Sequence, residues 1–94
     1  MDANIKHDDE DLRFYAELDG EEAELTYTYT EDTVLDMDHT FVPPSKRGKG
    51  IADQLVKAGL DFAKSQDYKI IPSCPVVEAY VQRHPEYKDL VKEV

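Results

Sequence analysis

Residues 42–55, VPPSKRGKGIADQL, mark an abrupt change in the pattern of the chain. Before this stretch, apolar and polar residues alternate with a period of two, which is typical of half-buried β-strands. After it, apolar residues recur at intervals of three and four, as on one face of an amphipathic helix. Pro43 and Pro44 end the preceding strand because proline has no N–H for a sheet ladder. The stretch is therefore predicted to connect a strand to a helix.

Four strands are predicted before this stretch, at residues 4–8, 12–18, 22–30 and 33–42. The third is the clearest, because leucine and tyrosine alternate along it with threonine, and tyrosine and threonine favour strands. On the fourth strand, alternation is expected to place Leu35, Met37, His39 and Phe41 on one face. The links between consecutive strands are short, which favours an antiparallel meander.

A helix is predicted for residues 50–66, where Ile51 and Leu55 belong to an apolar face. Asp53 and Lys57 lie four residues apart on the opposite face, and this spacing favours an ion pair between them. The helix is therefore expected to cover a sheet with one face and to meet solvent with the other.

An apolar run at 68–71 indicates a fifth, buried strand, followed by a short helix at 76–83 and an amphipathic tail at 87–94. A strand, a helix and a strand in this order form a right-handed unit with parallel strands. The predicted fold is of the α+β class: a mostly antiparallel sheet of about five strands, one parallel strand–helix–strand unit and two or three helices. We expect residues 1–94 to form a single domain, because this length supports one hydrophobic core.

The net charge of −10 is concentrated in the first part of the chain. Residues 1–38 contain 14 Asp and Glu side chains against two basic ones, whereas residues 39–94 contain seven against nine. This acidity argues against nucleic acid as a partner, since phosphate neutralisation needs a basic surface. Two interpretations of the acidic half remain: it attracts a cationic amine substrate, or it keeps the protein soluble.

The apolar runs, the opening residues and the cysteine content lead to expectations about the compartment and the partners of the protein. No apolar run reaches the roughly 18 to 20 residues of a membrane span, and the opening residues lack the basic and apolar regions of a secretion signal. A single cysteine, Cys74, excludes an internal disulfide and a cysteine-rich zinc site. We expect a metal-free cytoplasmic protein, with the nucleus as the alternative compartment, that has no membrane partner and is a monomer or a weak dimer.

Residues 46–52 indicate a phosphate site. A helix N-terminus has unpaired N–H groups and a partial positive charge, which attract phosphate. The glycines of the loop allow a close backbone approach, and Lys46, Arg47 and Lys49 add positive charge. The P-loop pattern is absent, and the dinucleotide pattern would need glycine where Asp53 stands. The predicted ligand is a pyrophosphate; the simpler alternative is a glycine-containing turn with incidental lysines.

The run Arg47-x-x-Gly50-x-Ala52 resembles the signature of the GNAT acetyltransferases, in which Arg or Gln, two residues and Gly are followed by one residue and Gly or Ala. The strand before it and the helix after it also match that family. Over roughly residues 5–91, the chain is similar to a subfamily of minimal GNAT-like N-acetyltransferases of about this length. This closer resemblance is carried by His39-Thr40, the loop at 47–52, Pro72-x-Cys74-Pro75, Tyr80 and His84-Pro85-Glu86-Tyr87.

The resemblance implies acetyl-coenzyme A as cosubstrate and a primary amine, including one on a protein or peptide, as acceptor. In the family, the loop amides hold the pyrophosphate of coenzyme A and the pantetheine arm lies along the preceding strand. Carried over to this chain, the contacts are Thr40, Phe41, Val42, Arg47, Gly48, Lys49, Gly50, Ile51 and Ala52. Larger GNAT enzymes have two more strands that build an acceptor pocket, so here the acceptor side is expected to be open.

Three residues are candidates for the chemistry. Cys74 follows the strand at 68–71, and parallel pairing places it near His39 and Thr40. A cysteine beside a histidine can act as a thiolate nucleophile, whereas the alternatives are a small buried cysteine and a hydrogen-bonded core histidine. Tyr80 stands where many GNAT enzymes have a tyrosine that protonates the departing thiolate; its alternative is a helix residue that covers the sheet.

Two mechanisms stay open. An amine attacks acetyl-coenzyme A directly while His39 or water accepts its proton, or Cys74 takes the acetyl group first. Asp36 and Asp38 are either substitutes for the glutamate base of larger enzymes or solvated surface carboxylates. The alternative functions are a non-catalytic module that binds coenzyme A or acyl-coenzyme A, and an acidic interaction domain without a ligand.

Overall fold

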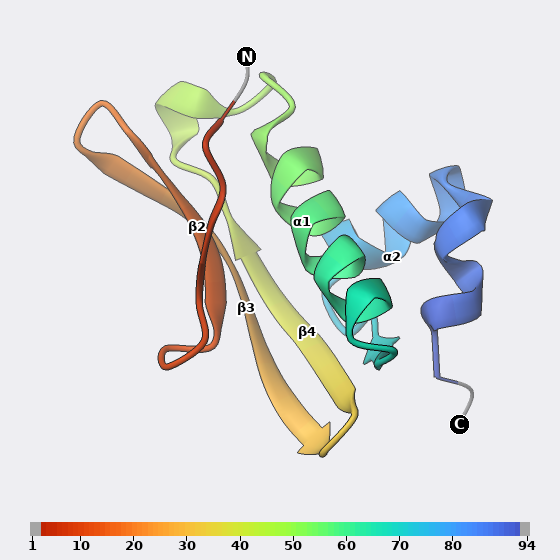
Figure 1. Cartoon of the computed structure of the whole chain (residues 1–94). Helices are drawn as coiled ribbons and strands as arrows, with labels where there is room; N and C mark the ends of the chain where they lie inside the picture. Colours follow the sequence, from red (N-terminus) through yellow and green to blue (C-terminus); the bar gives the residue numbers. More distant parts are fainter. Residues whose placement is uncertain (1–2, 93–94) are drawn as a thin grey trace.

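The computed structural model describes residues 3–92 and has one five-stranded sheet with helices packed beside it (Figure 1). The strands are β1 (Lys6–Asp8), β2 (Arg13–Leu18), β3 (Glu21–Glu31), β4 (Val34–Phe41) and β5 (Lys69–Ile71). The helices are α1 (Ile51–Ser65) and α2 (Pro75–Arg83), with 3₁₀ segments η1 (Pro44–Lys46) and η2 (Pro85–Leu90). Each predicted strand and helix is present within a few residues. The predicted tail includes part of η2, and its last two residues, 93–94, lie outside the described residues.

The sheet order follows the chain, β1-β2-β3-β4-β5. The first three pairings are antiparallel, and β4 pairs with β5 in parallel through the crossover helix α1. This confirms the predicted meander and the parallel strand–helix–strand unit. Along the outer side of β5, Val91 bridges Ile70, so the segment after η2 returns to the edge of the sheet.

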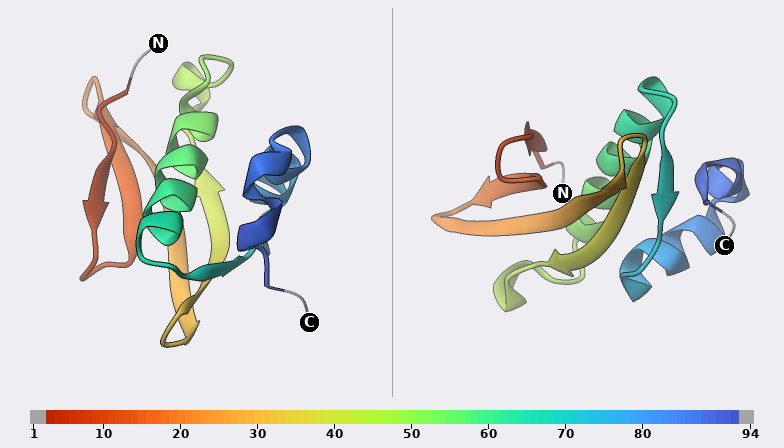
Figure 2. Two further views of the ribbon diagram at one scale, coloured as in Figure 1. Left: turned by 45° about the vertical axis from the view of Figure 1, so that its right-hand side comes forward. Right: turned by 90° about the horizontal axis from the view of Figure 1, so that it is seen from below.

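Helix α1 lies across one face of the sheet, with α2 and η2 beside it, while the other face of β2 and β3 has no helix over it in the described part of the chain (Figure 2). The core forms where the helix meets the strands. A Cβ atom built on Gly59 of α1 would lie 3.1 Å from both Leu25 and Met37, so glycine here permits the close approach of helix and sheet. Within residues 3–92, no helix is both long and apolar enough to span a membrane.

A β-bulge interrupts β4 near its carboxyl end. Tyr27 of β3 pairs with Met37, but the preceding residue, Thr26, pairs with His39. Thr26 therefore faces two residues of β4, and its hydroxyl donates to the carboxylate of Asp38 at 2.6 Å. An extra residue of this kind shifts the alternation of side chains along a strand.

The bulge reverses the faces of the last residues of β4. Thr40 pairs with the buried Leu25, so it shares the α1 face of the sheet with Met37. His39 and Phe41 turn to the opposite face, and both are exposed. The prediction that His39 and Phe41 share a face with Met37 is therefore wrong, because strict alternation does not hold across a bulge.

Candidate active site

The loop between β4 and α1 leaves main-chain donors open at the start of the helix. Gly50, the N-cap of α1, has φ 78°, and Gly48 has φ 80°, in the left-handed region that favours glycine. Within residues 3–92, the N–H groups of 51–53 donate to no side chain or loop carbonyl, as expected for the first turn of a helix. A Cβ atom on either glycine would meet no atom within 4 Å, so the space beside the loop is open.

A cavity of about 370 Å³ lies at this junction. Its wall combines the end of β4, the loop, the first turn of α1 and Val76 of α2. The predicted cofactor contacts that line it are Thr40, Val42, Arg47, Gly48, Gly50, Ile51 and Ala52. Phe41 and Lys49 are not among the lining residues. The bulge gives the reason for Phe41, whose side chain lies on the other face of the sheet.

Strands β4 and β5 separate where the cavity begins. Their parallel register ends at the pair of Asp36 with Ile71. One residue further along β4, the carbonyl of Met37 accepts a hydrogen bond from the N–H of Cys74 at 2.9 Å, and there the chain turns into α2. From Thr40 onward, β4 has no β5 partner in the described part of the chain. An extended ligand with amide groups can occupy such an unpaired edge.

The three basic side chains of the loop differ in their partners. The ammonium of Lys46 lies 2.6 Å from the carboxylate of Asp19, in the turn between β2 and β3. The Nε of Arg47 donates to the carbonyl of Val42 at 3.0 Å, so this side chain braces the end of β4. Lys49 has no ion pair within residues 3–92. Within residues 3–92, a carboxylate thus pairs with Lys46 but with neither Arg47 nor Lys49, and of these two only Arg47 lines the cavity.

The sulfur of Cys74 lies 3.4 Å from the hydroxyl oxygen of Thr40, and Cys74 is only 5% exposed. Parallel pairing thus brings Cys74 to the end of β4, as the sequence predicts. Its neighbour is Thr40 rather than His39, because His39 sits in the bulge, opposite Thr26 and exposed on the other face. The sequence predicts that Cys74 lies near both His39 and Thr40, and nothing in the run at 33–42 marks the bulge that turns only the hydroxyl of Thr40 toward the thiol.

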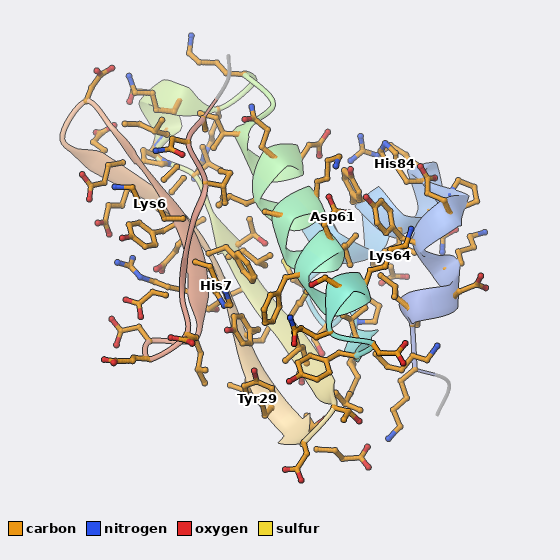
Figure 3. The ribbon with its side chains drawn as sticks, viewed as in Figure 1. Lys6, His7, Tyr29, Asp61, Lys64 and His84 are labelled. Carbon is orange, nitrogen blue, oxygen red and sulfur yellow. The ribbon has the colours of Figure 1, made fainter. Side chains whose placement is uncertain are left out.

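Tyr80 is buried at the junction of α2 with α1, and its ring stacks on His84 with centroids 4.0 Å apart. Burial raises the pKa of its phenol, while the charge of Lys57 on α1 opposes this rise. Figure 3 shows His84 on the C-terminal elements and Asp61 on α1. The described ring contacts of Tyr80 run to Arg83, His84 and Tyr87, and none runs to Cys74; its role as an acid stays a prediction.

The two carboxylates of β4 differ in their surroundings. Asp38 is exposed and accepts the hydroxyl of Thr26, as a solvated surface carboxylate does. Asp36 is half-buried, and its Oδ1 atom is enclosed without a hydrogen-bond partner in the described part of the chain. Across residues 3–92, no group of three or more His, Cys, Asp or Glu side chains is placed to hold a metal ion.

Comparison with known proteins places this geometry in a family. The family described as GCN5-related N-acetyl-transferase matches residues 13–90. Protein NATD1 of Homo sapiens is 37% identical over 83 residues, which cover 86% of this chain and 74% of that protein. Protein NATD1 of Danio rerio is 33% identical over 91 residues, which cover 93% of this chain and 83% of that protein.

The fold has a solved counterpart. The solution structure of a GCN5-like protein from Staphylococcus aureus superposes with a TM-score of 0.76 at 28% sequence identity, over 98% of this chain and 90% of that one. Sequence relatives and a solved structure thus agree on the family and on the fold. The chain belongs to the GCN5-related N-acetyltransferase family and is an acetyltransferase of that fold.

Proposed function

We propose that this protein transfers an acetyl group from acetyl-coenzyme A to a primary amine. The observation that carries the proposal is the cavity of about 370 Å³ at the β4–α1 junction, which combines open helix amides with an unpaired strand end. Each feature suits a different part of coenzyme A. A diphosphate is stabilised by N–H groups at a helix N-terminus, and the amide-bearing pantetheine arm by the edge of a strand.

The parts of the site fit the ligand in order. The glycines at 48 and 50 leave room for a diphosphate beside residues 51–53, and Lys49 supplies charge from outside. Residues 40–42 offer the strand edge for the pantetheine arm. This order directs the thioester toward the side chains of Thr40 and Cys74, where β4 and β5 separate. The acceptor amine then approaches from the side of the gap opposite the diphosphate.

In the direct mechanism, the amine nitrogen attacks the thioester carbonyl and gives up a proton to water, the carbon–sulfur bond breaks, and the departing sulfur takes up a proton. In the two-step mechanism, the sulfur of Cys74 forms the new bond to the acetyl carbon, and its proton passes to the sulfur of coenzyme A. The position of Cys74 beside the unpaired end of β4 supports the second route. The exposure of His39 on the other face gives no support to a basic role for it.

Calorimetric titration with coenzyme A tests the site. Wild-type protein should bind, and Gly50→Val should weaken binding at least tenfold, because valine is strained at φ 78° and narrows the approach to the amides. Arg47→Glu should weaken binding as well, since it adds negative charge and removes the brace on Val42. Leu12→Val is the matched control, because Leu12 also has a left-handed backbone, with φ 54°, but lies in the turn between β1 and β2. Wild-type affinity in both loop variants would refute the placement.

A module that binds coenzyme A without turnover is the second candidate, because Thr40, the side chain that contacts the thiol of Cys74 in the described structure, is not an ionisable base. Mass spectrometry after incubation with acetyl-coenzyme A distinguishes the two functions. An enzyme that uses the two-step route gains one acetyl group on Cys74 and transfers it to an added amine. A module binds the ligand, acetylates no amine, and keeps its affinity in Cys74→Ala.

A further inference from the structure

We propose that Arg83 is a positioning residue for the anionic ligand, because it neutralises the carboxylate of Asp53 in the wall of the phosphate-binding cavity. This inference rests on the function proposed above and adds a device by which a helix start that carries an acidic residue can accept a diphosphate. The two residues lie 30 positions apart and come from different helices, α1 and α2.

Asp53 is the third residue of α1, and it lines the cavity together with Gly50, Ile51 and Ala52. A carboxylate in the first turn stabilises the helix when no ligand is bound, since it complements the partial positive charge of the N-terminus. The same carboxylate opposes an anionic ligand that approaches the same N–H groups. Its side chain is 44% exposed, so its charge acts on the cavity unless a cation offsets it.

Arg83, the last residue of α2, supplies that cation in a two-pronged contact. Its Nη1 and Nη2 atoms donate to the two carboxylate oxygens of Asp53 at 3.2 and 3.0 Å. The guanidinium carbon also lies 5.7 Å from the ring centre of Tyr80, which helps to fix the side chain. An exposed pair of this kind adds little to stability. Its main effect is on the electrostatic potential of the cavity.

A second basic side chain, on α1 itself, has the spacing that favours an ion pair with Asp53, but it pairs with another carboxylate. Lys57, four residues after Asp53, lies 2.7 Å from the carboxylate of Asp61 instead. Within residues 3–92, Arg83 is therefore the ion-pair partner of Asp53. Helix α2 also contributes Val76, near its N-terminus, to the cavity wall. The pair of Arg83 with Asp53 therefore holds the C-terminal end of a helix whose N-terminal end lines the site.

The test is a double-mutant cycle read by calorimetric titration with coenzyme A at low salt. Arg83→Gln should weaken binding about three- to tenfold, because it leaves the carboxylate of Asp53 uncompensated. Asp53→Asn should bind at least as tightly as wild type. The double variant, Asp53→Asn with Arg83→Gln, should recover to within about twofold of wild type. Lys57→Gln removes the same charge from a pair outside the cavity wall, and it should leave the affinity unchanged.

Salt dependence separates masking of charge from a structural role. The difference between wild type and Arg83→Gln should shrink several-fold in about 0.5 M salt, where exposed charges are screened, whereas a misplaced helix would remain misplaced. Arg83→Lys, which keeps the charge, should retain most of the affinity. If wild type does not bind coenzyme A, the proposed function itself fails. If wild type binds, any of three results overturns the inference: Arg83→Gln has wild-type affinity, Asp53→Asn binds more weakly than wild type, or the double variant binds as weakly as Arg83→Gln.

Discussion

The sulfur of Cys74 and the hydroxyl oxygen of Thr40 lie 3.4 Å apart across the gap where β4 and β5 separate. This contact depends on the bulge in β4, which turns Thr40 toward α1 and His39 away from it. The side chain that contacts the thiol is thus a hydroxyl, and the imidazole next to it in sequence faces the opposite side of the sheet.

The reactivity of Cys74 should depend on Thr40 and not on His39. In the structure the thiol of Cys74 donates to the hydroxyl of Thr40, and this hydroxyl can donate in turn once the thiol has lost its proton. Thr40→Val keeps the shape of the side chain but removes the hydroxyl, and it should slow alkylation of Cys74 by iodoacetamide about two- to tenfold because the thiolate loses this donor. His39→Gln should leave the rate within about twofold of wild type. Mass spectrometry of the modified thiol gives both rates. A slow rate in His39→Gln with a normal rate in Thr40→Val would contradict the contact.

Release of Lys46 from its partner should strengthen binding of an anionic ligand. Lys46 lines the cavity, and its ammonium is paired with the exposed Asp19. Asp19→Asn should tighten coenzyme A binding about two- to threefold at low salt, since it removes a negative charge near the site. Asn tolerates the left-handed backbone at this position, where φ is 54°.

The matched control for this change is Asp67→Asn, because Asp67 also has a left-handed backbone, with φ 62°, but lies just beyond the other end of α1. Calorimetry at low and at high salt measures both variants. Equal gains in the two variants would show that overall charge, rather than the local pair, sets the affinity.

Tyr87 should contribute to stability through its hydroxyl as well as its ring. Its side chain is buried in η2, and its hydroxyl donates to the carboxylate of Asp61 at 2.7 Å. Tyr87→Phe should lower the free energy of unfolding by about 1 kcal/mol, the usual size of one such hydrogen bond. Urea unfolding measures the change. Tyr15→Phe, whose hydroxyl has no hydrogen bond within residues 3–92, should change it by less than about 0.5 kcal/mol.

The stability of the sheet edge should fall in mild acid because of His7. Its ring stacks on Phe14 at 4.1 Å, meets Phe62 at 4.5 Å, and lies with its Nε2 atom 2.6 Å from the hydroxyl of Tyr27 (Figure 3). Burial lowers the pKa of His7 below its ordinary 6.5, although Asp9 and Asp8 oppose this effect. The unfolded chain therefore binds this proton more tightly than the folded one.

It follows that the free energy of unfolding decreases as the pH falls through 6.5 toward the lower pKa of folded His7. Urea unfolding between about pH 7.5 and about pH 5.5 measures the slope. His7→Phe keeps an aromatic ring against Phe14 and Phe62 and should flatten the slope over this range. An equal slope in wild type and in His7→Phe would show that other groups cause it.

The sequence predicts most of the fold because local patterns determine it. Alternation along residues 22–30 and helical spacing after residue 50 specify β3 and α1, and the crossover rule then makes β4 and β5 parallel. The bulge is not predictable in this way. It depends on how Thr26 is shared between Asp38 and His39 across two strands, and nothing in the run at 33–42 marks the extra residue.

For the candidate site too, features set by local sequence are predictable and features set by tertiary packing are not. The glycines and the helix start follow from the loop sequence, because backbone conformation and helix polarity are local properties. The ion-pair partners of charged side chains, in contrast, are determined by tertiary packing. The sequence favours a pair of Asp53 with Lys57, whereas the structure pairs Asp53 with Arg83 of α2, because α2 packs beside the first turn of α1. The pairing of Lys46 with Asp19 joins two turns in the same way.

The central claim is that open main-chain amides at the start of α1 bind the diphosphate of coenzyme A. Amide chemical shifts recorded by ¹H–¹⁵N NMR during titration with coenzyme A test it most directly. The account predicts that the largest shifts occur at residues 48–53, with smaller ones at 40–42, and that β1 remains unchanged. Saturable binding whose shifts leave residues 48–53 unmoved would contradict it.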